Sequence, residues 1–121
     1  MPPKILIAED EQPIRELLEA FLVDEGYRVA TAPNGRAALV ALATERYDLV
    51  ISNVMMPDMT GNELAHAIHA DPTLARIPLI MMSAAGARYV PPGPHAAYLP
   101  KPFDLDALLA TVARVLARVV H

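Results

Sequence analysis

Short apolar segments alternate with segments of helical periodicity along most of the chain. Apolar runs occupy residues 4–8, 27–32, 49–51 and 77–83, and a further short one covers residues 95–99. The residues between them, and those after the last run, repeat apolar positions at the spacing of an amphipathic helix. This alternation predicts an α/β domain in which helices cover both faces of a parallel sheet.

Turn and capping residues predict where the helices begin and end. Pro13 suits the first turn of the first helix, and Gly26 stops that helix. Asn34 and Asp104 have the side-chain oxygen needed to cap the second and the last helix. The third helix is expected to end near Asp71, which precedes a proline.

The segment GARYVPPGP at residues 86–94 breaks this rhythm. It holds three of the chain's 12 prolines, and an interior proline costs a helix roughly 3 kcal/mol. We therefore expect no regular helix between the fourth and fifth strands. The overall expectation is a single domain over residues 1–121, with a doubly wound five-stranded sheet in the order 2-1-3-4-5.

Composition narrows the possible functions. The net charge of −4 offers no basic field for phosphates, so we expect no direct nucleic acid binding. The absence of cysteine excludes disulfides, thiol catalysis and cysteine metal sites. No apolar run can span a bilayer and no signal-peptide pattern is present, so the chain is expected to be soluble, cytoplasmic and without a membrane partner.

Polar side chains stand at the predicted carboxyl ends of several strands. They are Glu9 and Asp10 after the first strand, Asn53 on the third, Ser83 on the fourth and Lys101 after the fifth. In the order 2-1-3-4-5 the first and third strands are neighbours, so the acids and the amide should face each other. Hard oxygen ligands of this kind suit Mg2+, and a hydroxyl and an ammonium group could hold a phosphate beside it.

Taken singly, each of these residues has a simpler explanation. The acids from Glu9 to Glu11 suit the dipole of the following helix, Lys101 alone would be a solvated charge, and Ser83 alone would cap a strand. His66 and His69 share a helix face without a matching acid, which indicates exposed residues more than a metal site. Only the ordered combination indicates a phosphoryl site.

Four features together resemble one known family. They are the pair Glu9-Asp10, the VMMPDMTG turn that follows Asn53, Ser83 with Ala84, and the segment YLPKPF at residues 98–103. Over essentially its whole length, the chain resembles a response-regulator receiver domain of two-component signalling, which has a flavodoxin-like fold. The resemblance implies a module that takes a phosphoryl group from a histidine kinase or phosphotransfer protein and then switches a downstream protein effector.

The resemblance also implies roles for individual residues. Asn53 stands where the family has its phosphoacceptor aspartate. The implied Mg2+ ligands are Glu9, Asp10, Asn53 and the backbone carbonyl of Met55. The implied phosphoryl-binding and switch residues are Ser83, Ala84, Tyr98 and Lys101, with a cis peptide bond before Pro102.

The chain departs from the family at two places. An amide is not a usable nucleophile toward phosphorus, so Asn53 predicts a phosphorylation-null protein with weakened Mg2+ binding. One sequence leaves open whether Asn53 is native or engineered, although the intact neighbouring residues favour substitution or recent loss. The second departure is the partner surface, where the fourth helix would be lost or replaced by a Pro-rich loop that contains Tyr89, Val90, Pro91, Pro92 and Pro94.

These expectations describe a signalling module and not an enzyme. One alternative is a protein-binding scaffold that works without phosphorylation. A less favoured alternative is a small Mg2+-dependent phosphatase or phosphotransferase that uses the same acids, because no aspartate stands at the nucleophile position.

Overall fold

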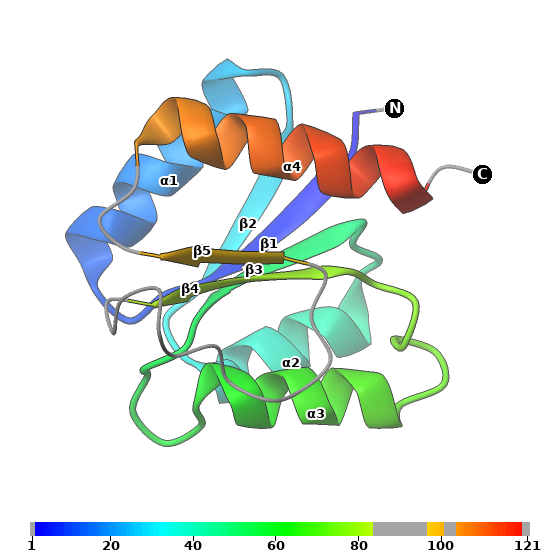
Figure 1. Cartoon of the computed structure of the whole chain (residues 1–121). Helices are drawn as coiled ribbons and strands as arrows, with labels where there is room; N and C mark the ends of the chain where they lie inside the picture. Colours follow the sequence, from blue (N-terminus) through cyan, green and yellow to red (C-terminus); the bar gives the residue numbers. More distant parts are fainter. Residues whose placement is uncertain (1, 84–96, 101–103, 120–121) are drawn as a thin grey trace.

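A single parallel sheet forms the centre of the molecule. The computed structural model describes residues 2–83, 97–100 and 104–119, and all the structural statements below concern these residues (Figure 1). The five strands lie in the order β2-β1-β3-β4-β5, and every neighbouring pair is parallel. This confirms the predicted topology. The strands are β1 Lys4–Ala8, β2 Arg28–Ala32, β3 Leu49–Asn53, β4 Leu79–Ser83 and β5 Ala97–Pro100.

Helices cover both faces of this sheet. Figure 1 shows α1 and α4 on one face, and α2 and α3 on the other. This arrangement is the one expected when crossover connections join parallel strands. The four described helices are α1 Gln12–Asp24, α2 Gly35–Thr44, α3 Gly61–Ala70 and α4 Leu105–Val119.

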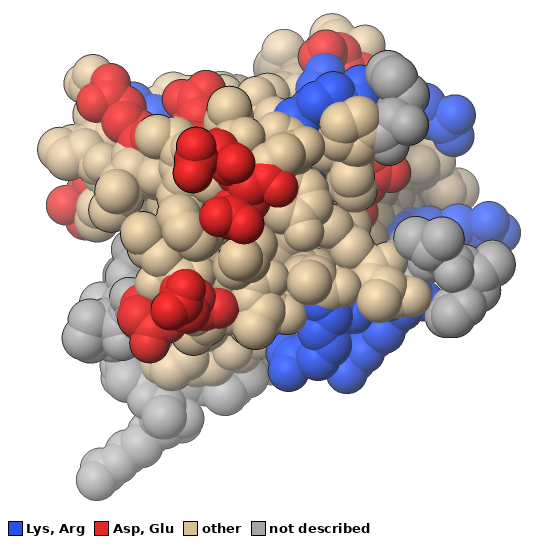
Figure 2. All heavy atoms as spheres, turned by 90° about the horizontal axis from the view of Figure 1, so that it is seen from above, with Lys and Arg blue, Asp and Glu red and all other residues tan. Residues whose placement is uncertain are grey.

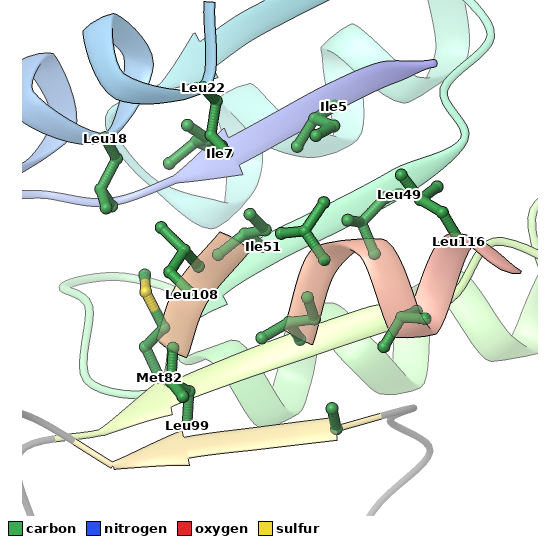
Figure 3. Close-up of a cluster of buried hydrophobic side chains, with 14 residues drawn as sticks. Ile5, Ile7, Leu18, Leu22, Leu49, Ile51, Met82, Leu99, Leu108 and Leu116 are labelled. Atoms are coloured by element: carbon green, nitrogen blue, oxygen red, sulfur yellow. The ribbon is translucent and has the colours of Figure 1, made fainter. Parts of the chain in front are cut away.

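The strands divide their side chains between two hydrophobic clusters. Successive side chains of a strand point to opposite faces, so Ile5 and Ile7 of β1 lie under α1 and α4, whereas Leu6 lies under α2 and α3. In Figure 3, Leu18 and Leu22 of α1 and residues of α4 converge on the first of these clusters. Because both faces are covered, β1, β3 and β4 read as continuous apolar runs.

Side-chain caps fix the starts of three helices. Asn34 Oδ1 accepts from the Ala37 amide at 2.8 Å, and Asp104 Oδ1 accepts from Ala107 at 2.6 Å, which confirms both predicted caps. At α3 the sequence interpretation missed a capping box, in which Thr60 and Glu63 each accept from the other's backbone N–H.

Single residues determine where two of the elements begin or end. The fourth strand begins at Leu79, two residues after the predicted Ile77, because Pro78 has no N–H for the sheet and contributes only its carbonyl, which accepts from Val50 at 3.0 Å. Gly26 has φ +99°, a left-handed conformation that glycine adopts without strain, and it ends the first helical segment as predicted.

The prediction that a helix is missing between β4 and β5 concerns residues outside the described part of the chain. The helix labelled α4 follows β5 and is the last helix that the sequence predicts, the one capped by Asp104.

The charges on α4 follow its helix dipole. Asp106 lies in its first turn and Arg118 in its last turn, an arrangement that favours the helix at both ends. Figure 2 looks down on the face that carries α1 and α4, where acidic and basic side chains gather in mainly separate areas. Neither sign of charge therefore covers this face continuously.

Gly61, the first residue of α3, has no room for a side chain. A Cβ atom there would lie 2.5 Å from the Asn53 carbonyl oxygen and 2.9 Å from the Val54 Cα, and both are backbone atoms. Its own N–H donates to the Val54 carbonyl at 2.8 Å. The close approach holds the start of α3 against the end of β3.

We therefore expect Gly61→Ala to lower the free energy of unfolding by more than about 2 kcal/mol in urea titrations. Helix propensity alone would give the opposite sign, by up to about 1 kcal/mol. Gly35→Ala is the matched control, since its Cβ would meet only the Met59 side chain, at 2.9 Å. The decrease in the free energy of unfolding should therefore be smaller for Gly35→Ala than for Gly61→Ala. Equal stability of Gly61→Ala and the parent would contradict this packing.

Candidate functional site

The register of the sheet brings the acids and the amide together. Ala8 of β1 pairs with Ser52 of β3, so the residues that follow them, Glu9 just after β1 and Asn53 at the end of β3, lie side by side at the carboxyl edge. Both lie in the interior, with Glu9 fully buried and Asn53 6% exposed. Asp10 follows Glu9 and is partly exposed. The predicted neighbourhood of these three residues is therefore present in the structure.

The amide nitrogen of Asn53 lies at the centre of this site, which consists of Glu9, Asp10, Asn53 and the Met55 carbonyl and is called the acidic pocket below. Nδ2 donates to Glu9 Oε2 at 3.3 Å, to Asp10 Oδ1 at 3.3 Å and to the Met55 carbonyl oxygen at 3.0 Å. The carboxylates accept and cannot donate when ionised, so they draw the NH2 group inward and turn the amide oxygen away. Three of the four residues that were predicted to surround a metal ion thus surround the side-chain nitrogen of the fourth, Asn53.

Glu9 is held by further contacts from the start of α1. Its Oε2 also accepts from the Glu11 amide at 3.0 Å, and its backbone carbonyl accepts from Arg15 Nη1 at 2.8 Å. The Arg15 contact was missed from the sequence, although an arginine six residues after Glu9 is well placed to reach back from the first turns of α1. Glu9 is therefore positioned by both its backbone and its side chain.

The loop after β3 combines tight backbone geometry with one exposed apolar side chain. Asp58 has φ +69°, and the Met59 amide donates to the Pro57 carbonyl at 2.8 Å across it. Aspartate tolerates this left-handed region better than most residues. Met55, whose carbonyl accepts from the amide, leaves its side chain 67% exposed. The loop thus places an apolar surface beside a polar pocket.

Ser83 and Tyr98 occupy the neighbouring strands. Ser83 ends β4 and is fully buried, and Tyr98 of β5 is partly buried against the cluster under α2 and α3. Both have interactions of their own. The other predicted site and surface residues lie outside the described part of the chain: Ala84, Tyr89, Val90, Pro91, Pro92, Pro94, Lys101 and Pro102.

The oxygen atoms of the pocket have the chemistry of a Mg2+ site. Two carboxylates and a backbone carbonyl are hard donors that converge on one point, although at the 3.0–3.3 Å of a hydrogen bond, and Mg2+ requires ligands at about 2.1 Å. Among the described residues no group of three His, Cys, Asp or Glu side chains could hold a metal. The Asn53 oxygen could complete the set only after the amide rotates, so the donors fit and the amide orientation does not.

A separate cavity of about 800 Å³ lies at the opposite, amino edge of the sheet. There Lys4 pairs with Glu45 at 2.6 Å, and this contact holds the pKa of Glu45 below its ordinary value. Burial raises the pKa of Tyr47. No predicted site residue lines this cavity, which is formed by residue 28, residues 42–48, residues 73 and 74, and residues 76–78.

Comparison with known families agrees with this geometry. The family model described as "Response regulator receiver domain" matches residues 5–113, which include all the described site residues. The chain belongs to this family. It is accordingly a receiver domain of two-component signalling, as the sequence resemblance indicated, and such domains act as signalling modules.

Individual relatives show the same resemblance over most of this receiver domain. The response regulator MprA of Mycolicibacterium vanbaalenii is 36% identical over 98% of the chain. The phosphate regulon transcriptional regulatory protein PhoB of Rhizobium meliloti is 35% identical, also over 98%. The response regulator protein TrrA of Thermotoga maritima, solved in complex with Mg2+-BeF, has 34% identity and a TM-score of 0.85, and 95% of this chain and 99% of that chain are covered.

The two regulators are longer proteins than this receiver domain. The chain spans about half their length, 52% of MprA and 54% of PhoB. PhoB is a transcriptional regulator by name, so the expectation of no nucleic acid partner, which came from the charge of these 121 residues, does not extend to a protein of that kind. As for membranes, none of the described helices has the length and apolar character needed to cross a bilayer.

Proposed function

We propose that this receiver domain transmits a signal between a histidine kinase or phosphotransfer protein and a downstream effector, and that with Asn53 in place it does so without being phosphorylated. The observation that supports the proposal is the position of Asn53 at the end of β3, where its amide faces Glu9 and Asp10. The residue that would have to attack phosphorus carries a delocalised amide instead of a carboxylate.

The surrounding residues support phosphoryl chemistry that one substitution would restore. The two acids follow β1, the Met55 carbonyl lies in the loop after β3, and the buried Ser83 ends the neighbouring strand β4. When bound, Mg2+ would supply charge neutralisation at the phosphoryl oxygens. The chain's own contribution is to hold Glu9 in place through Glu11 and Arg15.

The effector could be a DNA-binding region or a separate protein. Relatives such as PhoB are transcriptional regulators about twice as long as this chain, which supports an effector that binds DNA. TrrA, by contrast, is matched over 99% of the solved chain. The second candidate, a scaffold that binds partners in one fixed state, is favoured by the three hydrogen bonds that already occupy the pocket.

Incubation with acetyl phosphate and Mg2+ tests the proposal. We expect no label on the parent and stoichiometric label on Asn53→Asp, where a carboxylate oxygen takes the phosphoryl group and acetate leaves. Intact-protein mass spectrometry measures the mass added by the phosphoryl group. Asp58→Asn in the Asn53→Asp background is the control for labelling of the nearby exposed loop, and it should keep the label.

Two other outcomes would overturn parts of this proposal. A variant with the restored carboxylate that takes no label would favour the scaffold. Continuous release of acetate and phosphate by the parent would favour a phosphatase.

We also expect Asn53→Asp to bind Mg2+ at least about tenfold more tightly than the parent in isothermal titration calorimetry. The variant adds a negative charge and has no amide hydrogen bonds to break. Asn34→Asp adds the same charge at the α2 cap, where a carboxylate can also accept from Ala37, and should bind Mg2+ like the parent. Equal affinities of all three proteins would contradict the expectation.

A further inference from the structure

The Asn53 amide makes contacts that a cation would otherwise make. One nitrogen atom with two hydrogens is shared among three oxygen acceptors, two of them carboxylate oxygens and one a carbonyl oxygen. Shared hydrogen bonds of this kind are longer than simple ones, in keeping with 3.3 Å to each carboxylate. The nitrogen is therefore central to the pocket and does not merely border it.

Burial makes this arrangement energetically important. A carboxylate without water needs hydrogen bonds or positive charge, and neighbouring carboxylates in one pocket repel each other. Glu9 is fully buried and shares its Oε2 between the Asn53 amide and the Glu11 N–H. The amide places two N–H dipoles between the acids, where an aspartate at this position would add a third negative charge.

The same nitrogen also fixes the loop after β3. Its contact with the Met55 carbonyl links the start of the loop to the acids that follow β1. The loop then continues through the tight turn at Asp58 to Gly61, which is packed against the end of β3. The amide thus adds a side-chain link between the segments that follow the paired strands β1 and β3.

We propose that the Asn53 amide nitrogen replaces the divalent cation, so that this receiver domain holds its acidic pocket closed without Mg2+. The inference rests on the proposed function in one respect, namely that residue 53 is not a phosphoacceptor. A cation can enter only if the amide rotates and gives up its contacts with Glu9, Asp10 and Met55. We therefore expect the pocket to keep the same structure with and without Mg2+ as long as the amide stays in place.

Denaturant unfolding with and without Mg2+ tests this inference. In the parent, we expect the unfolding equilibrium constant to change less than about twofold between chelator and millimolar Mg2+. Asn53→Asp should unfold at lower urea than the parent in chelator, and Mg2+ should lower its unfolding constant at least about tenfold. Asn34→Asp, with equal added charge, should behave as the parent does.

Two further variants keep the test decisive. Asn53→Ala removes the bridge without adding charge, and we expect it to unfold at lower urea than the parent in chelator. If Asn53→Asp fails to fold without Mg2+, Asp10→Asn in that background should rescue it, since this change removes one charge and supplies an amide. Stabilisation of the parent by Mg2+ as large as that of Asn53→Asp would overturn the inference, as would an Asn53→Ala protein as stable as the parent.

The outcome is separable from that of the phosphorylation test. If Asn53→Asp takes no label but shows Mg2+-dependent stability that the parent lacks, the proposed function fails and the cation replacement stands. If Asn53→Asp is labelled and Mg2+ stabilises the parent equally well, the cation replacement fails alone.

Discussion

Two carboxylates at the end of a buried strand cannot remain close together without positive charge or hydrogen-bond donors between them. Glu9 and Asp10 follow β1 directly, and the parallel register with β3 determines which side chain stands opposite them. In this receiver domain that side chain is an amide with two donors. The geometry of the pocket, the loop after β3 and the reactivity at residue 53 all depend on that choice.

The arrangement of the strands and helices does not require that chemistry. It follows from the two apolar clusters on either side of the sheet, and the cluster shown in Figure 3 lies under α1 and α4. An exchange of oxygen for nitrogen at Asn53 changes neither cluster, because asparagine and aspartate have nearly the same shape. Membership of the family and competence for phosphoryl transfer are therefore separate properties of this chain.

Much of the architecture follows from periodicity that the sequence displays directly. Continuous apolar runs predict strands covered on both sides, and the order of strands and helices predicts the parallel sheet. Local details were harder to predict from the sequence. The capping box of Thr60 and Glu63 is written in the sequence but competes with the reading of Thr60 as a turn residue. Pro78 shortens β4 because a missing N–H outweighs an apolar pattern.

For Glu9, Asp10 and Asn53, the sequence predicted that the residues lie together but not how they hydrogen-bond. Strand ends and register bring Glu9, Asp10 and Asn53 together, whatever the side-chain orientation. Which end of the amide faces the acids depends on hydrogen bonds among all the groups present, and residue spacing does not encode it. The predictions for Lys101, Pro102 and the Pro-rich segment at residues 86–94 concern parts of the chain that the structure does not describe.

The alternation of side chains along β1 has a consequence for how the domain can vary. Ile5 and Ile7 contact one helical layer and Leu6 contacts the other, with the sheet backbone between them. Substitutions in separate layers share few neighbours, and the effects of distant, non-contacting changes usually add. Either layer can therefore be redesigned while the other is left unaltered, so the surface formed by α1 and α4 and the surface formed by α2 and α3 can diversify independently.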